Sequence, residues 1–444
     1  MSTLPDRASK STGKLPREGG QPRGFFASAV TVYLVALAIR LVGGWWLGQF
    51  SHPPTWEYEQ IADSLLAGRG FVLDYLGTPY RAFTLPLYPV FCAVVYWLTQ
   101  HDHAVVLVLQ CLISAGACLQ VRAIGRVMSH EPWVAVWSGW LVALHPGLVV
   151  FASRLHALTL EVGMFLAVLW AWLKIMQRPG WGMAVVTGCS SGLALLTRGT
   201  IIPFVALAMG WFMWRAPLPR GEAVKRLAVI VLIAGLMVAP WLRRNARYFH
   251  RFPLMLTETG ELLWRGNHAL ASGSGYLPDG REVLAAAPES FRQRLARLDE
   301  FGQARFFSQE ARRFIREHPL GFLALYVRKV VYFWWFSPQT GLLYPRRYLL
   351  GYQLFYIPLL MLALVGLRAS RRLLTDARLA LPLLFLVSVC AVQSLYYVDG
   401  RHRWTVEPVL LLFSALGGAR LLRRVPRRRS AMRPLLVAGI GGSG

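Results

Sequence analysis

The sequence predicts an all-α polytopic membrane protein, a bundle of about ten (eight to twelve) transmembrane helices with juxtamembrane helices in its external loops. Of its 444 residues, 55% are hydrophobic, and the mean hydropathy is positive. Apolar runs of about 16–25 residues recur along the chain, which is the length needed to cross a hydrocarbon layer roughly 30 Å thick. These runs do not alternate apolar and polar residues, as half-buried strands do.

The predicted spans are residues 25–49, 104–121, 132–151, 156–177, 181–197, 200–214, 224–241, 347–367, 378–397 and 404–421. Two further apolar stretches, 84–99 and 320–337, are placed at the outer interface. The first is short and opens with two prolines. The second carries Arg328 and Lys329 near its middle, which suits an interfacial helix better than a span.

The net charge of +26 does not indicate a nucleic-acid partner, because the basic residues gather in short segments between apolar runs. With both interfacial stretches outside, the strongly basic short loops fall on the cytoplasmic side, which is the positive-inside pattern. Both chain ends are then cytoplasmic, and we expect a bacterial inner membrane protein whose acidic first loop faces the exterior.

The predicted organisation has three parts. Residues 1–24 are polar and are expected to form a disordered cytoplasmic N-terminus. Residues 25–424 form the transmembrane domain, with a first external loop at 51–103 and a large external loop at 242–346. Residues 425–444 form a basic cytoplasmic tail.

Several common chemistries find no support in the sequence. The cysteines lie in apolar runs without CxxC spacing, so they indicate neither a zinc site nor a disulfide framework. There is no phosphate-binding P-loop, no HExxH motif and no GxSxG motif with triad partners. ATP hydrolysis, zinc proteolysis and serine hydrolysis are therefore disfavoured.

The acidic segment after the first span is the leading candidate for chemistry. A helix is predicted to begin after Thr55 as N-cap and to end near Gly68 and Gly70. Glu57 and Glu59 are two residues apart and cannot share a helix face, so one can point inward while the other is solvated. An inward carboxylate can take a proton from a hydroxyl; the alternative is a solvated interfacial helix.

A second acid, Glu161, stands at the start of an apolar run on the same external side, close to His156. An acid at membrane depth is costly, and it is usually functional or paired. Pairing with Arg154 or Arg198 is the alternative to a catalytic role.

Two polar segments suit the recognition of phosphate and sugar. The large loop brings arginines together with glycines, hydroxyls and an amide, from Arg244 to His268. Arg401 and Arg403 lie at the external edge of the last span, against the positive-inside rule. A lipid-linked phosphate gives a reason to keep two guanidiniums there, because arginine binds phosphate oxygens bidentately.

Together these segments resemble the GT-C superfamily of polytopic glycosyltransferases. The closest likeness is to family 39, or RgtA/B/C/D-like proteins, related to protein O-mannosyltransferases and lipid A aminoarabinose transferases. The markers are Glu57-Tyr58 with Gly68-Arg69-Gly70-Phe71, Pro86-Leu87-Tyr88-Pro89, His145-Pro146, Glu161, Arg198, Pro240-Trp241, Arg244-Asn245, Trp264-Arg265-Gly266-Asn267 and Arg401-His402-Arg403. Many relatives carry an acid three or four residues before the helix tyrosine, where this chain has Pro54 and Thr55. Glu57 is the best substitute.

The resemblance implies a GT-C-type bundle and an inverting transfer of a hexosyl or pentosyl group from a polyprenyl-phosphate sugar to an acceptor hydroxyl at the external face. The acceptor is a lipid, a glycan or a protein. Glu57 and Glu161 are the implied catalytic acids. The implied donor-phosphate residues are Arg81, Arg198, Arg244, Arg401 and Arg403. The implied sugar or acceptor residues are Tyr58, Glu59, Tyr88, His156, Trp264, Asn267 and His268. No metal ligand is assigned, and a divalent metal remains possible.

Two other functions stay open at this stage. An O-antigen polymerase or ligase also places arginines outside the membrane. A polysaccharide or lipid transporter should instead show charges at the membrane midplane, broken helices and paired halves. The acidic helix after the first span favours the transferase.

Overall fold

The computed structural model describes residues 24–250, 255–340, 345–370 and 375–424. The predicted N-terminal segment, except for its last residue, and the predicted basic tail lie outside the described residues. Within these ranges the chain is almost entirely helical, and its only named strands form one short hairpin. The predicted all-α class is therefore confirmed.

Helices occur at all ten predicted span positions. They are α1 (Ala29–Trp46), α4 (His103–Met128), α5 (Pro132–Ala143) with α6 (Pro146–Ala152), α7 (Leu158–Gln177), α8 (Trp181–Leu195), α9 (Ile202–Arg215), α10 (Arg220–Phe249), α16 (Arg346–Ala369), α17 (Ala377–Gln393) and α19 (Glu407–Arg424). In the described part of the chain, five of them are long and apolar enough to cross a membrane: α1, α4, α7, α10 and α16. The pair α5 and α6 brings the number to six if it is one span.

In the described part of the chain, the number of helices suited to crossing is thus lower than the ten or so predicted, and the other helices are too short or carry charge at their ends. The 15 residues of α8 and the 14 of α9 extend roughly 22 Å at 1.5 Å per residue, short of a hydrocarbon layer roughly 30 Å thick. Charged residues stand at both ends of α19. These helices pack against longer neighbours, α8 against α7 and α10, and α19 against α16.

The span predicted at 132–151 is broken. Its two halves, α5 and α6, meet at an angle of 54°. Pro146 opens α6 because its missing N–H is not needed in the first turn, and the Nδ1 atom of His145 caps the helix by accepting the Leu148 N–H at 3.1 Å. The break therefore comes from a Pro and a side-chain cap at one point of the sequence.

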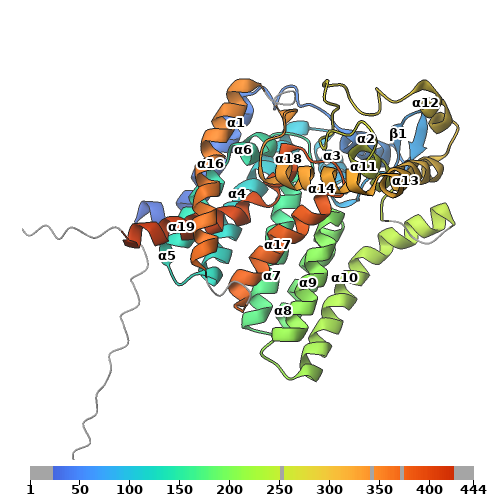
Figure 1. The fold of residues 1–444 in the computed structure, drawn as a ribbon. Coiled ribbons are helices and arrows are strands. Elements are labelled where there is room, and N and C mark those ends of the chain that lie inside the picture. The colour runs from blue at the N-terminus through green and yellow to red at the C-terminus, as the bar shows by residue number, and fades with distance from the viewer. Residues whose placement is uncertain (1–23, 251–254, 341–344, 371–374, 425–444) are drawn as a thin grey trace, which may run out of the picture.

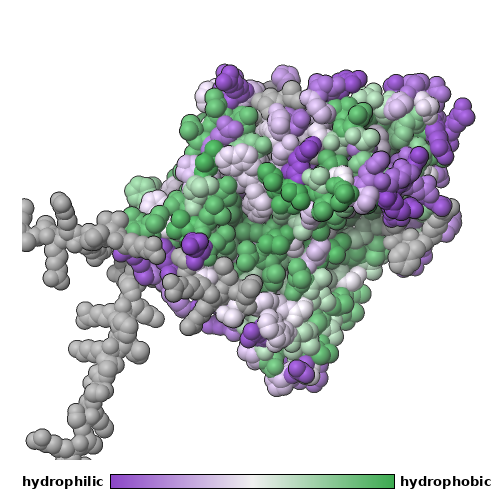
Figure 2. Space-filling model, viewed as in Figure 1, coloured by the Kyte–Doolittle hydropathy of each residue, from purple (hydrophilic) through white to green (hydrophobic). Residues whose placement is uncertain are grey.

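Short elements form a layer on one side of the long helices (Figure 1). They are α2 (Glu57–Leu66), β1 (Leu73–Tyr75), β2 (Thr78–Tyr80), α3 (Leu87–Thr99), α11 (Thr259–Gly266), α12 (Glu289–Ala296), α13 (Glu300–Glu317), α14 (Pro319–Trp334) and α18 (Gly400–Trp404). Figure 2 shows hydrophobic side chains over the long helices and hydrophilic ones concentrated around α12 and α13. The two stretches placed at the outer interface are α3 and α14, and neither is among the helices suited to crossing.

Two packed regions hold this arrangement. Side chains of α4, α7, α17 and α19 fill the main core, which includes the fully buried Trp172 and Phe165. A separate apolar cluster around Trp264 and Phe307 holds the short helices of the large loop. The loop predicted at 242–346 thus has its own core, and its first residues continue α10 as far as Phe249.

Candidate active site

A cavity of about 1020 Å³ lies where the short-element layer meets the ends of the long helices. Its wall combines the start of α2, the turn between α6 and α7, the residues around Arg198, the start of α11 and the segment that leads into α18. The predicted site residues that line it are Glu57, Tyr58, His156, Glu161, Arg198 and Arg401. Segments far apart in the sequence therefore converge on one space.

Glu57 and Glu258, which come from distant segments of the chain, are two of the acids that face this cavity. Glu57 is the first residue of α2, whose N-cap is Trp56 without a side-chain hydrogen bond. The predicted N-cap, Thr55, is thus wrong by one residue. Burial raises the pKa of Glu57, and the Arg401 guanidinium opposes this rise. Burial, followed by the charges of Glu57 and Glu261, raises the pKa of Glu258 to about 8. Near neutral pH, Glu258 therefore retains its proton.

Glu161 forms an ion pair inside the wall. Its Oε2 lies 3.3 Å from Nη1 of Arg198, and the same guanidinium donates through Nη2 to Gln393 at 3.3 Å. The side chain of Glu161 is only 2% exposed, whereas that of Arg198 is 27% exposed. The acid holds the guanidinium in place and leaves part of it open to the cavity, so the pairing alternative for Glu161 has a partner in Arg198.

Arg265 provides a second guanidinium. Its Nε donates to Glu261 at 2.8 Å, and its Nη2 donates to the Tyr75 hydroxyl at 3.3 Å. Tyr75 in turn donates to Glu261 at 2.8 Å. This triangle fixes α11 against the hairpin. A third guanidinium, that of Arg401, lies over the Trp56 ring with 5.6 Å between its Cζ and the ring centroid.

Two histidines in the wall are neutral hydrogen-bond donors. Burial lowers the pKa of His156 and of His402 well below the ordinary range, and nearby arginines lower it further. Nδ1 of His156 accepts the Leu158 N–H at 3.0 Å, and Nδ1 of His402 accepts the Asp399 N–H at 2.9 Å. Each neutral ring therefore carries its proton on Nε2. Such donors suit phosphate or sugar oxygens.

Several predicted residues lie outside the cavity wall. Glu59 is buried in α2 and pairs with His103. Tyr88 is buried in α3, donates to Gln110 at 2.5 Å and meets the Tyr58 ring edge-on. Neither is among the residues that line the space. Tyr88 contacts Tyr58, which does line the cavity, and so helps to position that ring.

Arg81 and Arg244 belong to a cluster behind the hairpin. Arg244 donates to the carbonyls of Phe71 and Arg81 and to the side chain of Asn245. The Arg81 guanidinium lies over the Tyr248 ring at 4.7 Å, and its backbone N–H donates to Glu300 at 2.6 Å. These contacts bind the hairpin to the end of α10.

Trp264, Asn267 and His268 support the wall from behind. Trp264 is part of the apolar core of the large loop and stacks on the His268 ring. Asn267 donates to the carbonyls of Leu263 and Leu395, both at 2.7 Å, and accepts from Lys329 at 2.9 Å. The amide thus joins α11, α14 and the segment after α17.

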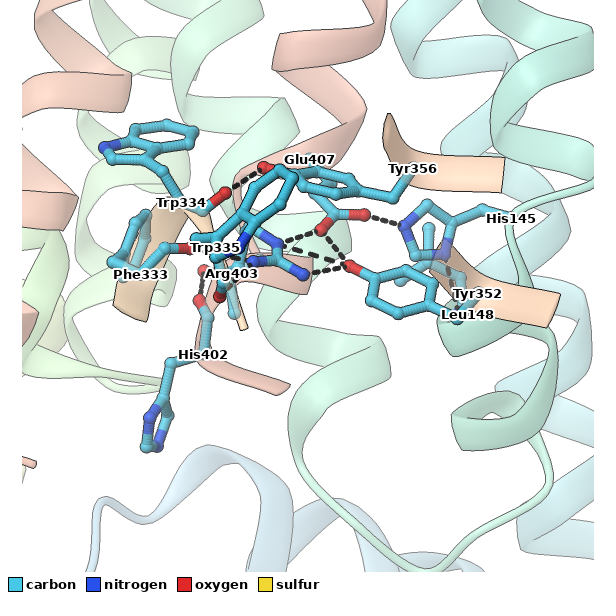
Figure 3. Close-up of polar contacts among 11 residues, drawn as sticks. His145, Leu148, Phe333, Trp334, Trp335, Tyr352, Tyr356, His402, Arg403 and Glu407 are labelled. Carbon is cyan, nitrogen blue, oxygen red and sulfur yellow. Dashed lines mark hydrogen bonds and ion pairs between the residues drawn. The ribbon is translucent and has the colours of Figure 1, made fainter. Parts of the chain in front are cut away.

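Arg403 lies in a buried ion cluster beside the cavity (Figure 3). Its guanidinium pairs with Glu407 and donates to the Tyr352 hydroxyl at 2.7 Å from Nη2. Nη1 donates to the carbonyls of Phe333 and Trp335 at 3.2 and 3.0 Å. His145 completes the cluster on the other carboxylate oxygen. In Figure 3 the ring of His402 points away from this cluster, and it is His402, not Arg403, that lines the cavity.

Sequence reasoning assigned no role to Glu258, Arg265, Asp399 or His402, all of which line the cavity. Glu258 stands in a segment otherwise made of hydroxyls and glycine, and His402 stands between two arginines. An acid or a histidine inside a segment already selected for phosphate recognition is the signal that could have found them.

No protein-family model and no curated protein sequence matches this chain. Solved structures do. The apo oligosaccharyltransferase of Archaeoglobus fulgidus aligns with a TM-score of 0.52 and 14% identity over 89% of this chain and 50% of that one. The same enzyme described in complex with Zn and sulfate gives 0.53 and 14%, over 89% and 49%. ArnT from Cupriavidus metallidurans bound to undecaprenyl phosphate gives 0.40 and 17%, over 89% and 77%.

This chain spans about half the length of the oligosaccharyltransferase that it matches. The alignment shows the fold alone: the chain is folded like this oligosaccharyltransferase over 89% of its length. The expected GT-C resemblance is therefore confirmed at the level of the fold.

Proposed function

We propose that this protein is a membrane glycosyltransferase that transfers a sugar from a polyprenyl-phosphate carrier to an acceptor hydroxyl at the external face. The observation that carries the proposal is the composition of the cavity. Its wall joins carboxyls from α2 and the start of α11 to the guanidiniums of Arg198, Arg265 and Arg401. A base for the acceptor and cations for a departing phosphate are the two requirements of this reaction.

Glu57 is the proposed base, since it lines the cavity at the start of α2. The acceptor oxygen attacks the anomeric carbon while its proton passes to the Glu57 carboxylate. The bond from the anomeric carbon to the phosphate oxygen breaks, and its electron pair leaves with polyprenyl phosphate. Attack opposite the leaving group inverts the anomeric configuration.

The guanidiniums receive the charge that develops on the phosphate. Arg198 is aligned by Glu161, so the acid acts as a positioning residue in this scheme. The Nε2–H groups of His156 and His402 provide further donors without adding positive charge. A volume of about 1020 Å³ accommodates a glycosyl phosphate together with part of an acceptor.

The test uses full-length protein in detergent with a panel of polyprenyl-phosphate sugars, and it measures released polyprenyl phosphate. We expect release that Glu57→Gln reduces by about 100-fold or more, the usual contribution of a general base, with donor binding retained. Glu289→Gln, at an exposed acid on α12, is the matched control and should retain full activity.

Two results would contradict the proposal in different ways. Activity of Glu57→Gln within threefold of wild type rejects Glu57 as the base and directs attention to Glu258. Uptake of the lipid-linked sugar into vesicles without bond cleavage rejects the transferase and favours a transporter.

A further inference from the structure

Two acids and two histidines converge outside the cavity, on the opposite side of α2. Glu59 and Asp63 are four residues apart and share one face of that helix. His101 lies in the short connection between α3 and α4, and His103 is the first residue of α4. None of the four lines the candidate active site.

The imidazole nitrogens of both histidines meet carboxylates. Nε2 of His101 lies 2.6 Å from Oδ1 of Asp63, and Nε2 of His103 contacts Oε1 of Glu59. One ligand atom from each of Glu59, His101 and His103 lies within 4.8 Å of the other two. Nitrogen and oxygen donors from α2, from the α3–α4 connection and from the start of α4 therefore lie close together.

The backbone and an aromatic ring set the positions of the histidines. Gln100 and His101 both adopt left-handed conformations, with φ of 54° and 72°, which turns the chain sharply between α3 and α4. Tyr96 stacks on His101 with 4.3 Å between ring centroids and meets His103 edge-on at 5.4 Å. Both rings are thus held with their Nε2 atoms toward α2.

We propose that this cluster binds one Zn²⁺ ion through Glu59, His101 and His103, with Asp63 as the fourth ligand. Two imidazoles and two carboxylates form a donor set that favours Zn²⁺ over Mg²⁺ or Ca²⁺, which prefer all-oxygen ligands. The metal would take the place of the direct imidazole–carboxylate contacts, since its ligand atoms must be free of protons.

The burial gradient of the cluster provides an entry path. The side chain of Glu59 is 9% exposed, that of His103 31%, and those of His101 and Asp63 42% and 43%. An ion from the surrounding solution reaches the outer pair first and the buried carboxylate last. The bound metal would join α2 to the α3–α4 connection and to the start of α4. Because Glu57 begins α2 on a different face, the metal holds that helix in place without entering the cavity.

The test measures metal binding directly and does not depend on transferase activity. Full-length protein, purified in detergent through a tag without histidine, is stripped with a chelator and titrated with Zn²⁺ against a chromophoric competitor. Elemental analysis after gel filtration gives the stoichiometry. We expect one Zn²⁺ per chain and an increase in Tm that excess Mg²⁺ does not reproduce. Co²⁺ should give the intense visible absorption of a four-coordinate site.

Two variants and a matched control separate ligation from folding. His101→Ala/His103→Ala should lose Zn²⁺ binding by about tenfold or more and lose the increase in Tm. Glu59→Gln removes one ligand while preserving shape, and it should weaken binding while unfolding cooperatively without metal. His52→Ala/His318→Ala changes two exposed histidines away from the cluster and should bind as wild type does. Equal affinity in wild type and the His101/His103 variant, or no bound Zn²⁺ in wild type, would overturn the proposal.

Discussion

At the scale of single residues, Glu258 shows how a pocket changes a side chain that is unremarkable in the sequence. Burial and two neighbouring acids raise its pKa to about 8 from an ordinary value of 4.5. Between these two values the folded protein holds a proton that the unfolded chain has released. Raising the pH through this window therefore favours unfolding, and the effect levels off above about pH 8.

Glu258→Gln should remove this pH dependence. The amide cannot ionise, so the stability of the variant relative to wild type should increase from pH 5 to pH 8, by on the order of 1–3 kcal/mol after allowance for partial solvation of the site. Thermal unfolding followed by tryptophan fluorescence in detergent at several pH values gives the measurement. Glu289→Gln serves as the control, and a parallel response of both variants would argue against the raised pKa.

His402 and Arg403 show that neighbours in the sequence can have different surroundings in the structure. The two are adjacent, yet one lines the cavity and the other is enclosed by the ion cluster with Glu407. In the short α18, successive residues point in different directions, and the packing of α14 and α16 around Arg403 decides which of them joins the ion cluster. Sequence spacing pointed to this segment but could not tell which of its residues faces the cavity.

At the scale of elements, α16 and α19 cross at a pair of glycines. A Cβ atom at Gly417 would lie 2.0 Å from the Leu362 carbonyl oxygen, and one at Gly366 would lie 2.1 Å from that of Phe413. Backbone thus rests on backbone at this crossing, as is common where small residues allow membrane helices to approach closely.

Gly417→Ala should force the two helices apart and lower the Tm. Gly418→Ala is the internal control: it adds the same methyl group one residue later, where nothing lies within 4 Å. Because alanine is the better helix former, this control should be neutral or slightly stabilising, by up to about 1 kcal/mol. Thermal unfolding of both variants in one detergent provides the comparison, and equal Tm values would show that the crossing is looser than described.

A comparison of predicted and observed elements shows which parts of the fold can be predicted from the sequence. Long apolar runs located a helix at every predicted span, since burial in lipid or core requires such runs in either case. The break at His145 needed tertiary information, because Pro146 is compatible with both a kink and a new helix. The hairpin was not predicted: its strands are three residues each, too short for any periodic signal, and its turn depends on positive φ at Leu76 and Gly77.

At the scale of the whole molecule, the cavity depends on segments from both halves of the chain. Glu57 and Arg401 lie far apart in the sequence and line the same space. The sequence predicted this meeting only through topology, by assigning both residues to one side of the membrane. The sequence did not predict that Glu258 lines this cavity, because no local pattern indicates which loop lies next to the start of α2.

Topology can be measured with single cysteines placed at exposed positions. A membrane-impermeant maleimide should label Ser51→Cys and Asp279→Cys in intact spheroplasts, because both positions belong to the layer that holds the cavity. Pro217→Cys, in the turn between α9 and α10, should react only after permeabilisation. The unmodified chain sets the background, since four of its five cysteines are buried. Labelling of all three positions from the same side would refute the proposed orientation.

The broken span has a further effect on the molecule. Gly147, the second residue of α6, packs closely against the indole of Trp404, and an added Cβ would lie 2.5 Å from that ring. The indole belongs to the same five-residue helix as Arg401 and His402. Any larger residue at position 147 must therefore displace the tryptophan, and the part of the cavity wall formed by Arg401 and His402 would shift with it. A methyl group added at position 147 would thus change the shape of a cavity that it does not line, and a smaller ring at position 404 would make room for it.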